Sequence, residues 1–332
     1  MNFVYESLKP YRLIISIYAI ITAFFFLTEG GASLTATRTL FSESTFIKIA
    51  TGQILFIGGG IGLLILFILY YTVDRKKLGR VKDMLMEFAI FMMLLVWSLF
   101  LIDILYISAR PDNIILWSDT FMDMDKKIFD VYPAFFMYQH YNAVLEKIIV
   151  WTYNFLPIVA AGWTGFLIAS QRIIELRLWS KRIFLALGIC IPLWIVFPAG
   201  QPLSMYVVNV FDRPISAEIA ESIAKGPPSS FLNQSTLLYA DMRIDPTEAH
   251  HDVSNFPSMH AIWGLLLFAS FARVFRSRYL SLLLFFIACA NMLGAIYLLQ
   301  HYAVDMIAGI VAYAGVIYIL NKTDQSAHLE NN

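Results

Sequence analysis

The sequence predicts an all-α fold: a polytopic membrane bundle of about eight transmembrane helices, with a cap of folded loops on one side. Three observations predict it. The 332 residues are 59% hydrophobic and only 14% charged, which is more apolar surface than one soluble core of this length buries. The apolar residues gather into runs of about 20, the length of helix that crosses a bilayer. The basic residues cluster between these runs.

Eight apolar runs are predicted to span the membrane. The first follows a polar N-terminal segment and no signal-peptide cleavage site stands out after it, so we expect a retained helix. The last three runs follow one another closely. The predicted spans are 11–28, 51–73, 86–108, 146–169, 183–199, 259–273, 279–299 and 302–320.

Short basic loops predict the orientation of the bundle. Each of three loops follows an even-numbered span, so with eight spans all three lie on the same side as both termini. The positive-inside rule makes that side cytoplasmic. The residues that carry this argument are Arg75, Lys76, Lys77, Arg80, Lys82, Arg172, Arg177, Lys181, Arg182, Arg273, Arg276 and Arg278.

The opposite, extracytoplasmic side receives the long connections, at residues 29–50, 109–145 and 200–258. They mix aromatic, polar and turn-forming residues, so we expect a folded cap that carries function. The predicted organisation is a region of N-terminal helices and outer loops (1–145), a catalytic membrane domain (146–320) and a cytoplasmic tail (321–332).

Charge and cysteine content narrow the expected partners. The net charge is +0 and the basic residues lie between apolar runs, so there is no reason to propose a nucleic-acid partner. The expected partner is the membrane itself. The two cysteines, Cys190 and Cys289, both lie in apolar runs, where we expect small hydrophobic side chains and no disulfide.

Two short segments place ionisable residues at the membrane edge, where such groups are costly and mark function. Residues 255–260 read NFPSMH and residues 300–305 read QHYAVD. The chain is predicted to cross the bilayer twice between them. We therefore expect His260 and His301 on the same face of the membrane, as neighbours.

The spacing within these segments predicts their chemistry. His301 and Asp305 are four residues apart, so a helix places them on one face, where the carboxylate can orient the imidazole as a nucleophile or base. Pro257 fits the first turn of a helix. Ser258 then lies beside unpaired backbone N–H groups, a seat for a phosphate oxygen. His260 is placed to donate a proton to a leaving oxygen.

The two segments resemble motifs of the type 2 phosphatidic acid phosphatase (PAP2) superfamily, P-S-G-H and S-R-x5-H-x3-D, which read PSMH and HYAVD here. They are most similar to the inositol phosphorylceramide synthase branch, which favours F-P-S-[LM]-H and H-Y-x-x-D. The segment FPAGQP at 197–202 resembles a proline-bearing segment of that branch. The resemblance covers about residues 146–320 and implies a PAP2-like helical core.

The resemblance implies a role for each residue of the site. His301 would take a phosphoryl group onto its ring, Asp305 would orient that ring, and His260 would protonate the leaving group. The family uses no metal, so no cofactor is expected. Phosphate contacts must then come from basic side chains and backbone N–H groups.

The cations of the superfamily motifs are incomplete in this chain. The arginine that precedes the nucleophile falls at Ala295. In the first motif, K-x6-R-P, the lysine position is Tyr206, although Arg213 and the proline after it are present. Our candidates for holding the phosphate are therefore three cations of the outer loop, Arg213, Arg243 and Lys225.

These features predict a lipid phosphotransferase that acts on a phosphate-bearing lipid through a phosphohistidine. An alcohol acceptor makes the protein a transferase, and water makes it a lipid phosphate phosphatase. The motif likeness favours transfer, as do long outer loops that limit access of water. Two other classes stay open: a zinc-dependent membrane hydrolase with His, His and Asp as ligands, and a non-enzymatic lipid transporter whose histidines line a cavity.

Overall fold

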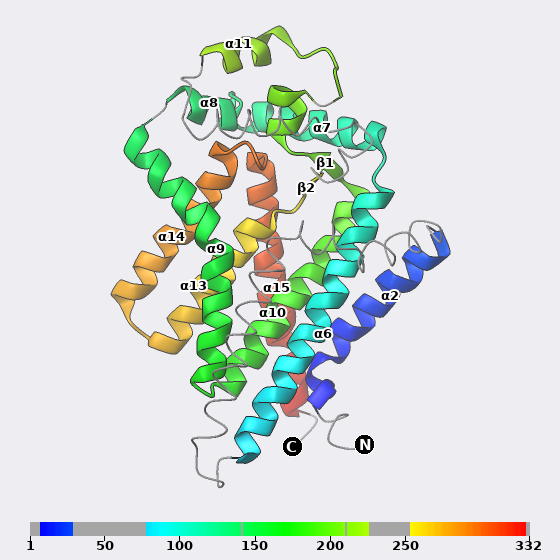
Figure 1. The fold of residues 1–332 in the computed structure, drawn as a ribbon, viewed down its shortest axis with the longest axis vertical. Coiled ribbons are helices and arrows are strands. Elements are labelled where there is room, and N and C mark those ends of the chain that lie inside the picture. The colour runs from blue at the N-terminus through cyan, green and yellow to red at the C-terminus, as the bar shows by residue number, and fades with distance from the viewer. Residues whose placement is uncertain (1–6, 29–77, 141, 210, 226–252, 330–332) are drawn as a thin grey trace.

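The computed structural model describes residues 7–28, 78–140, 142–209, 211–225 and 253–329. These residues form a bundle of long helices with shorter helices across one end, so the predicted all-α membrane fold is confirmed (Figure 1). One short pair of strands lies between the bundle and the shorter helices.

Seven of the eight predicted spans correspond to helices in the described part of the chain, and the eighth, 51–73, lies outside it. Five of these helices are long and apolar enough to cross a membrane. The other two, α2 and α13, have 17 residues each and are shorter. The seven helices are α2 (Arg12–Thr28), α6 (Leu78–Ser108), α9 (Ala143–Ala169), α10 (Ile173–Val196), α13 (Met259–Phe275), α14 (Arg278–Tyr297) and α15 (Ala303–Leu329).

Helix α10 lies in the middle of the bundle, in contact with α2, α6, α9, α13 and α15 (Figure 1). From residue 183 to its end its sequence carries no charged residue, as expected for a helix that is surrounded by others. Its largest side chains, Trp179, Phe184 and Trp194, are fully buried. The helices around it therefore share one apolar core.

A buried carboxylate ties three elements together at the end of the bundle away from the shorter helices. Glu87 of α6 accepts a hydrogen bond from the hydroxyl of Tyr11, in the short helix η1 (Lys9–Tyr11), at 2.7 Å. It also accepts one from Nε of Arg177 in α10 at 2.7 Å. Glu87 is 1% exposed, so the pairing satisfies a charge that would otherwise be very unfavourable here. The start of α2 and the end of α15 lie at this same end (Figure 1).

The predicted cap consists of three helices that lie across the other end of the bundle (Figure 1). They are α7 (Pro111–Phe129), α8 (Pro133–Gln139) and α11 (Ala217–Lys225). Helix α7 begins with a proline at its first position and ends where Asp130 adopts a positive φ, both common boundary features. Its buried residues recur at helical spacing on one face: Ile114, Ser118, Phe121, Met122 and Asp125.

A second apolar core joins the cap to the bundle. The ring of Phe121 in α7 stacks on that of Phe256, with centroids 4.5 Å apart. Strand β1 (Pro198–Gly200) pairs antiparallel with β2 (Val253–Asn255), and the π-helix η3 (Leu203–Val208) follows β1. The pairing holds the proline-bearing segment beside the residues that lead into α13.

Candidate active site

The structure brings His260 and His301 together. Their ring centroids are 5.5 Å apart and their planes meet at 65°. His260 lies in the first turn of α13 and His301 in the turn between α14 and α15, so the paired helices α13 and α14 carry the chain away and back (Figure 1). The ring of His260 also stacks on Tyr153 of α9, at 4.4 Å. Both imidazoles are close enough to contact one phosphoryl group.

The carboxylate of Asp305 orients His301. Nδ1 of His301 lies 3.2 Å from Oδ2 of Asp305, which also accepts the backbone N–H of Tyr302 at 3.2 Å. This bond indicates a ring with its proton on Nδ1, which leaves Nε2 as the basic nitrogen. Burial lowers the pKa of His301 below its usual value and so favours the neutral ring. His301 precedes α15 by two residues, so the contact spans the helix start.

The start of α13 differs in detail from the prediction. Ser258 is the N-cap residue, so Pro257 precedes the cap and is not in the first turn as predicted. The physical reason is that Ser258 has an extended backbone, with φ −68° and ψ 123°, so the helix can begin only after it. The carbonyl oxygen of Pro257 accepts a hydrogen bond from Nε1 of Trp194, at 3.1 Å. Oγ of Ser258 and Nδ1 of His260 are buried and have no hydrogen-bond partner. Such atoms are uncommon in folded proteins and mark where a polar ligand can bind.

The start of α15 is held by a residue that was not predicted from the sequence. Asp125 of the cap helix α7 accepts the N–H of Ala303 at 2.9 Å and that of Val304 at 2.8 Å. Asp125 is 2% exposed. The one sequence signal for it is an acidic residue in register with the apolar face of α7, seven residues after the buried Ser118.

Two glycines allow the helices around the histidines to approach closely. A Cβ on Gly309 of α15 would lie 2.7 Å from the carbonyl oxygen of Ser258 and 2.8 Å from Cβ of Ala261. A Cβ on Gly294 of α14 would lie 3.0 Å from Cβ of Tyr153. Backbone contact therefore contributes to the spacing of the two histidine segments.

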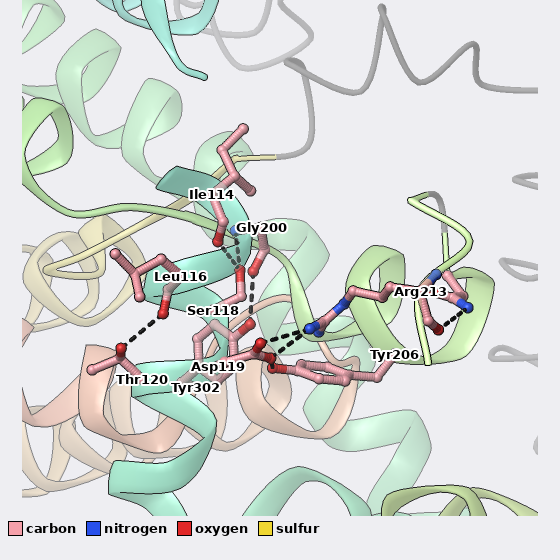
Figure 2. A network of polar contacts seen from close by, with 10 residues as sticks. Ile114, Leu116, Ser118, Asp119, Thr120, Gly200, Tyr206, Arg213 and Tyr302 are labelled. Atoms are coloured by element: carbon pink, nitrogen blue, oxygen red, sulfur yellow. Dashed lines mark hydrogen bonds and ion pairs between the residues drawn. The ribbon is translucent and has the colours of Figure 1, made fainter. Parts of the chain in front are cut away.

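A chain of hydrogen bonds ties the residue after His301 to the cap, as Figure 2 shows. The hydroxyl of Tyr302 donates to the carbonyl oxygen of Gly200 in β1, at 3.0 Å. The N–H of Gly200 donates to Oγ of Ser118 in α7, at 2.8 Å. The position of His301, the candidate nucleophile, therefore depends on the positions of β1 and α7.

Arg213 belongs to the same network and has donors left over (Figure 2). Its Nη1 donates to both carboxylate oxygens of Asp119 at 2.7 Å, and its guanidinium lies 4.8 Å from the ring centroid of Tyr206. Its Nε and Nη2 are buried without a partner. Two such N–H groups on one guanidinium suit a phosphate.

The remaining positions named from the sequence are placed differently. Lys225, at the end of α11, pairs with Glu221 in an exposed surface contact, and the structure does not bring it to the histidines. Arg243 lies outside the described residues. Ala295, at the position of the superfamily's arginine, is fully buried, and its carbonyl oxygen accepts the N–H of His301 at 3.1 Å. That position supports the histidine through its backbone alone.

The described residues offer no ligand set for a metal ion. No group of three or more His, Cys, Asp or Glu side chains in this part of the chain is placed to hold one. Oδ2 of Asp305 lies against Nδ1 of His301. The zinc-hydrolase alternative is therefore left without ligands in the described segments.

Comparison with protein families decides the identity of the fold. The family model described as the PAP2 superfamily matches residues 120–319, more than half of the chain. The chain belongs to the PAP2 superfamily. The match begins within α7 and ends within α15, so it includes both histidines and the part of α7 that carries Asp125. No curated protein and no solved structure matches the chain. Membership of the PAP2 superfamily supports a phosphatase- or phosphotransferase-type lipid function.

Proposed function

We propose that the chain is a membrane-embedded lipid phosphotransferase of the inositol phosphorylceramide synthase type, acting through a phosphohistidine. The observation that carries the proposal is the contact between His260 and His301, with Asp305 bonded to the second ring. One ring whose Nδ1 is bonded to a carboxylate and one ring that can carry a proton are the nucleophile and the acid that phosphoryl transfer needs.

In the first step, Nε2 of His301 attacks the phosphorus of a lipid phosphodiester. The bond from phosphorus to the leaving oxygen breaks, and protonated His260 gives its proton to that oxygen. One alcohol leaves, and the phosphoryl group stays on His301 through a nitrogen–phosphorus bond. Asp305 stabilises the positive charge that the ring acquires.

In the second step, the hydroxyl group of an acceptor attacks the same phosphorus. Neutral His260 takes the proton of that hydroxyl, and the nitrogen–phosphorus bond breaks. A new phosphodiester leaves, and both histidines return to their starting protonation states. With a lipid phosphomonoester as substrate and water in place of the alcohol, the same two steps would release inorganic phosphate, and the enzyme would be a lipid phosphate phosphatase.

The phosphate needs donors that the histidines do not supply. The N-terminus of α13 has no side-chain cap and presents the positive end of the helix dipole, and Oγ of Ser258 is unpartnered beside it. Arg213 has two buried donors without a partner and is our candidate cation for the phosphate. In this proposal these groups bind the phosphate, which is the role of the superfamily's motif cations that are replaced here by Ala295 and Tyr206.

Two observations favour an alcohol over water as acceptor. The first is the sequence of the two motifs, FPSMH and QHYAVD, which resembles that of the inositol phosphorylceramide synthase branch. The second is the apolar packing of α7 over the site, where Phe121 contacts both Phe256 and Tyr302. A covered site limits hydrolysis of the phosphoenzyme. We also propose that this covered end faces the extracytoplasmic side, because the basic residues of these loops that the structure describes lie at the other end, near the start of α6, between α9 and α10, and between α13 and α14.

Product analysis tests the proposal directly. Purified protein is incubated with phosphorus-labelled lipid phosphodiesters and monoesters, each with and without a lipid alcohol or a polyol, and the products are identified by mass spectrometry. We expect label on the added alcohol and a transient label on His301. If the same labelled products form at the same rate with and without an added alcohol, the protein is a phosphatase instead.

Chelation separates the proposal from the zinc alternative. We expect activity to survive EDTA and to be inhibited by vanadate, which mimics a phosphate in transfer. Activity that EDTA abolishes and added zinc restores would contradict the phosphohistidine mechanism. Lipid transport that survives replacement of both histidines would favour the transporter instead.

A further inference from the structure

The first backbone N–H groups of a helix have no partner within that helix and need one from elsewhere. At the start of α15, two carboxylates supply the partners for four consecutive residues. Asp305 binds the ring of His301 and the N–H of Tyr302. Asp125 binds the N–H groups of Ala303 and Val304. The nucleophile segment is thus held from one side by its own helix and from the other by the cap.

We propose that Asp125 is a positioning residue for the phosphoryl transfer: by accepting the first two N–H groups of α15, it fixes the turn that presents His301 to His260. Asp125 does not contact the reacting atoms in this proposal and acts only through the backbone of α15. The inference rests on the proposed function, because it assigns His301 as the residue to be positioned.

The surroundings of Asp125 show that the contact is built into the fold. The residue projects from the apolar face of α7, which Phe121 anchors on Phe256 and Ser118 anchors on Gly200. A buried carboxylate is unfavourable unless it is paired or hydrogen-bonded, and Asp125 has both oxygens bonded to N–H groups.

The electrostatics of Asp125 support the same role. Burial raises its pKa to about 7, and the nearby charge of Asp305 adds to the rise. The two N–H bonds from α15 oppose the rise but do not cancel it. The buried position of Asp125 is therefore unfavourable for its charge. Its contribution is the pair of hydrogen bonds that it accepts from the N–H groups at the start of α15.

Three variants test the proposal in the full-length protein. Asp125→Ala removes both acceptors, and Asp125→Asn keeps one acceptor oxygen in the same shape. Asp123→Asn is the matched control, because it removes the same charge from an exposed position on the same helix. For each variant we would measure kcat, KM, the thermal midpoint and amide hydrogen exchange of a peptide that covers residues 299–306.

The expected effect is on turnover. A displacement of about 1 Å at a reacting group can lower the rate on the order of 10²-fold. We therefore expect Asp125→Ala to lower kcat by roughly 30- to 100-fold, with KM within about threefold and faster exchange at residues 303 and 304. Asp125→Asn should recover a large part of the lost kcat and of the lost protection from exchange at residues 303 and 304. Asp123→Asn should match the unaltered protein in every measurement.

Several results would overturn the proposal. Unchanged kcat in Asp125→Ala would show that His301 needs no such support. Lost activity with unchanged exchange at residues 303 and 304, or an Asn variant as inactive as the Ala variant, would assign Asp125 a role other than positioning. Failure of the proposed function looks different: the unaltered protein then forms no label on His301, while the exchange data still decide whether Asp125 holds α15.

Discussion

The two helices that carry the site begin in opposite ways. At the start of α15, the N–H groups of Ala303 and Val304 are bonded to Asp125, and the residue is buried. At the start of α13, Ser258 makes no capping bond, and its Oγ is buried without a partner. Both helices start beside the same pair of imidazoles.

This difference separates two tasks within one site. A helix start whose backbone N–H groups are all bonded within the protein is fixed in position, but it has no N–H group available to bind a ligand. A helix start with unused donors can bind an anion through N–H groups and the helix dipole. We infer that α15 supplies a fixed nucleophile and α13 supplies the phosphate seat and the acid. The predictions below test that division, from the largest expected effect to the smallest.

Replacement of His301 with Ala should have the largest effect, because the nucleophile on the fixed helix start has no substitute. We expect loss of the phosphoenzyme and of all transfer, measured by labelling with a phosphorus-labelled lipid. His140→Ala is the control, since it removes an exposed histidine of the cap. Retained label in His301→Ala would rule out this residue as the nucleophile.

Replacement of His260 with Ala removes the proposed acid from the open helix start. General acid catalysis contributes roughly 10²- to 10⁴-fold, so we expect a loss of that order in kcat. A lipid analogue with a good leaving group, such as a nitrophenyl ester, should lose much less because its leaving oxygen needs no proton. Equal losses for both substrates would argue that His260 does not act as the acid.

Replacement of Ser258 with Ala should lower activity and leave stability intact. A hydrogen bond to a charged group contributes about 1.5–3 kcal/mol, so we expect roughly a 10- to 100-fold loss in kcat/KM. The thermal midpoint should not fall, because Oγ has no partner to lose. Ser270→Ala on the same helix should do the reverse, since Ser270 accepts a bond from Nε1 of Trp163 at 2.9 Å. A Ser258 variant that only loses stability would contradict the phosphate seat.

Replacement of Gly309 with Ala tests how the two helix starts are held together. The new Cβ would overlap the carbonyl oxygen of Ser258, and overpacking of this kind costs about 1–3 kcal/mol. We expect a lower thermal midpoint in detergent. Gly315→Ala on the same helix is the matched control, because nothing lies within 4 Å of its Cβ position. Equal midpoints for the two variants would show that the close approach is not needed.

An effect of similar size should appear in the pH dependence of stability. The pKa of Asp125 is raised from 3.8 to about 7, so the folded state binds a proton more tightly than the unfolded chain. The stabilisation is full below about pH 4 and is lost as the pH rises through 7. We expect the thermal midpoint of Asp125→Asn, relative to the unaltered protein, to improve between pH 5 and pH 8. A relative decline over that range would contradict the assigned shift.

Much of the fold followed from hydropathy, because a span of lipid requires a continuous apolar helix. The proximity of His260 and His301 also followed, since two crossings between them return the chain to the same end. The helices of the cap were harder to predict: residues 109–145 were expected to fold, but amphipathic helices of mixed composition lack the clear signal of a membrane span. The predicted boundary between regions at residue 145 stays a prediction.

The details that failed are those that depend on contacts between distant segments. Asp125 lies far from α15 in the chain, and no local spacing relates the two. The start of α13 depends on the extended backbone of Ser258, whose N–H donates to the carbonyl oxygen of Asp305 at 3.1 Å, a contact that the local sequence around the proline does not show. The pairing of Arg213 with Asp119 was likewise invisible, because it joins η3 and the residues after it to α7.

Because Asp125 of α7 accepts hydrogen bonds from the first two N–H groups of α15, the cap is not structurally independent of the helix bundle. A chimaera that takes residues 109–145 from one relative and the remaining helices from another would separate an acid from the helix it supports. Recombination between relatives should therefore yield working enzymes only when α7 and α15 are inherited as a pair. Substitutions in α7 and at the start of α15 are therefore expected to depend on one another.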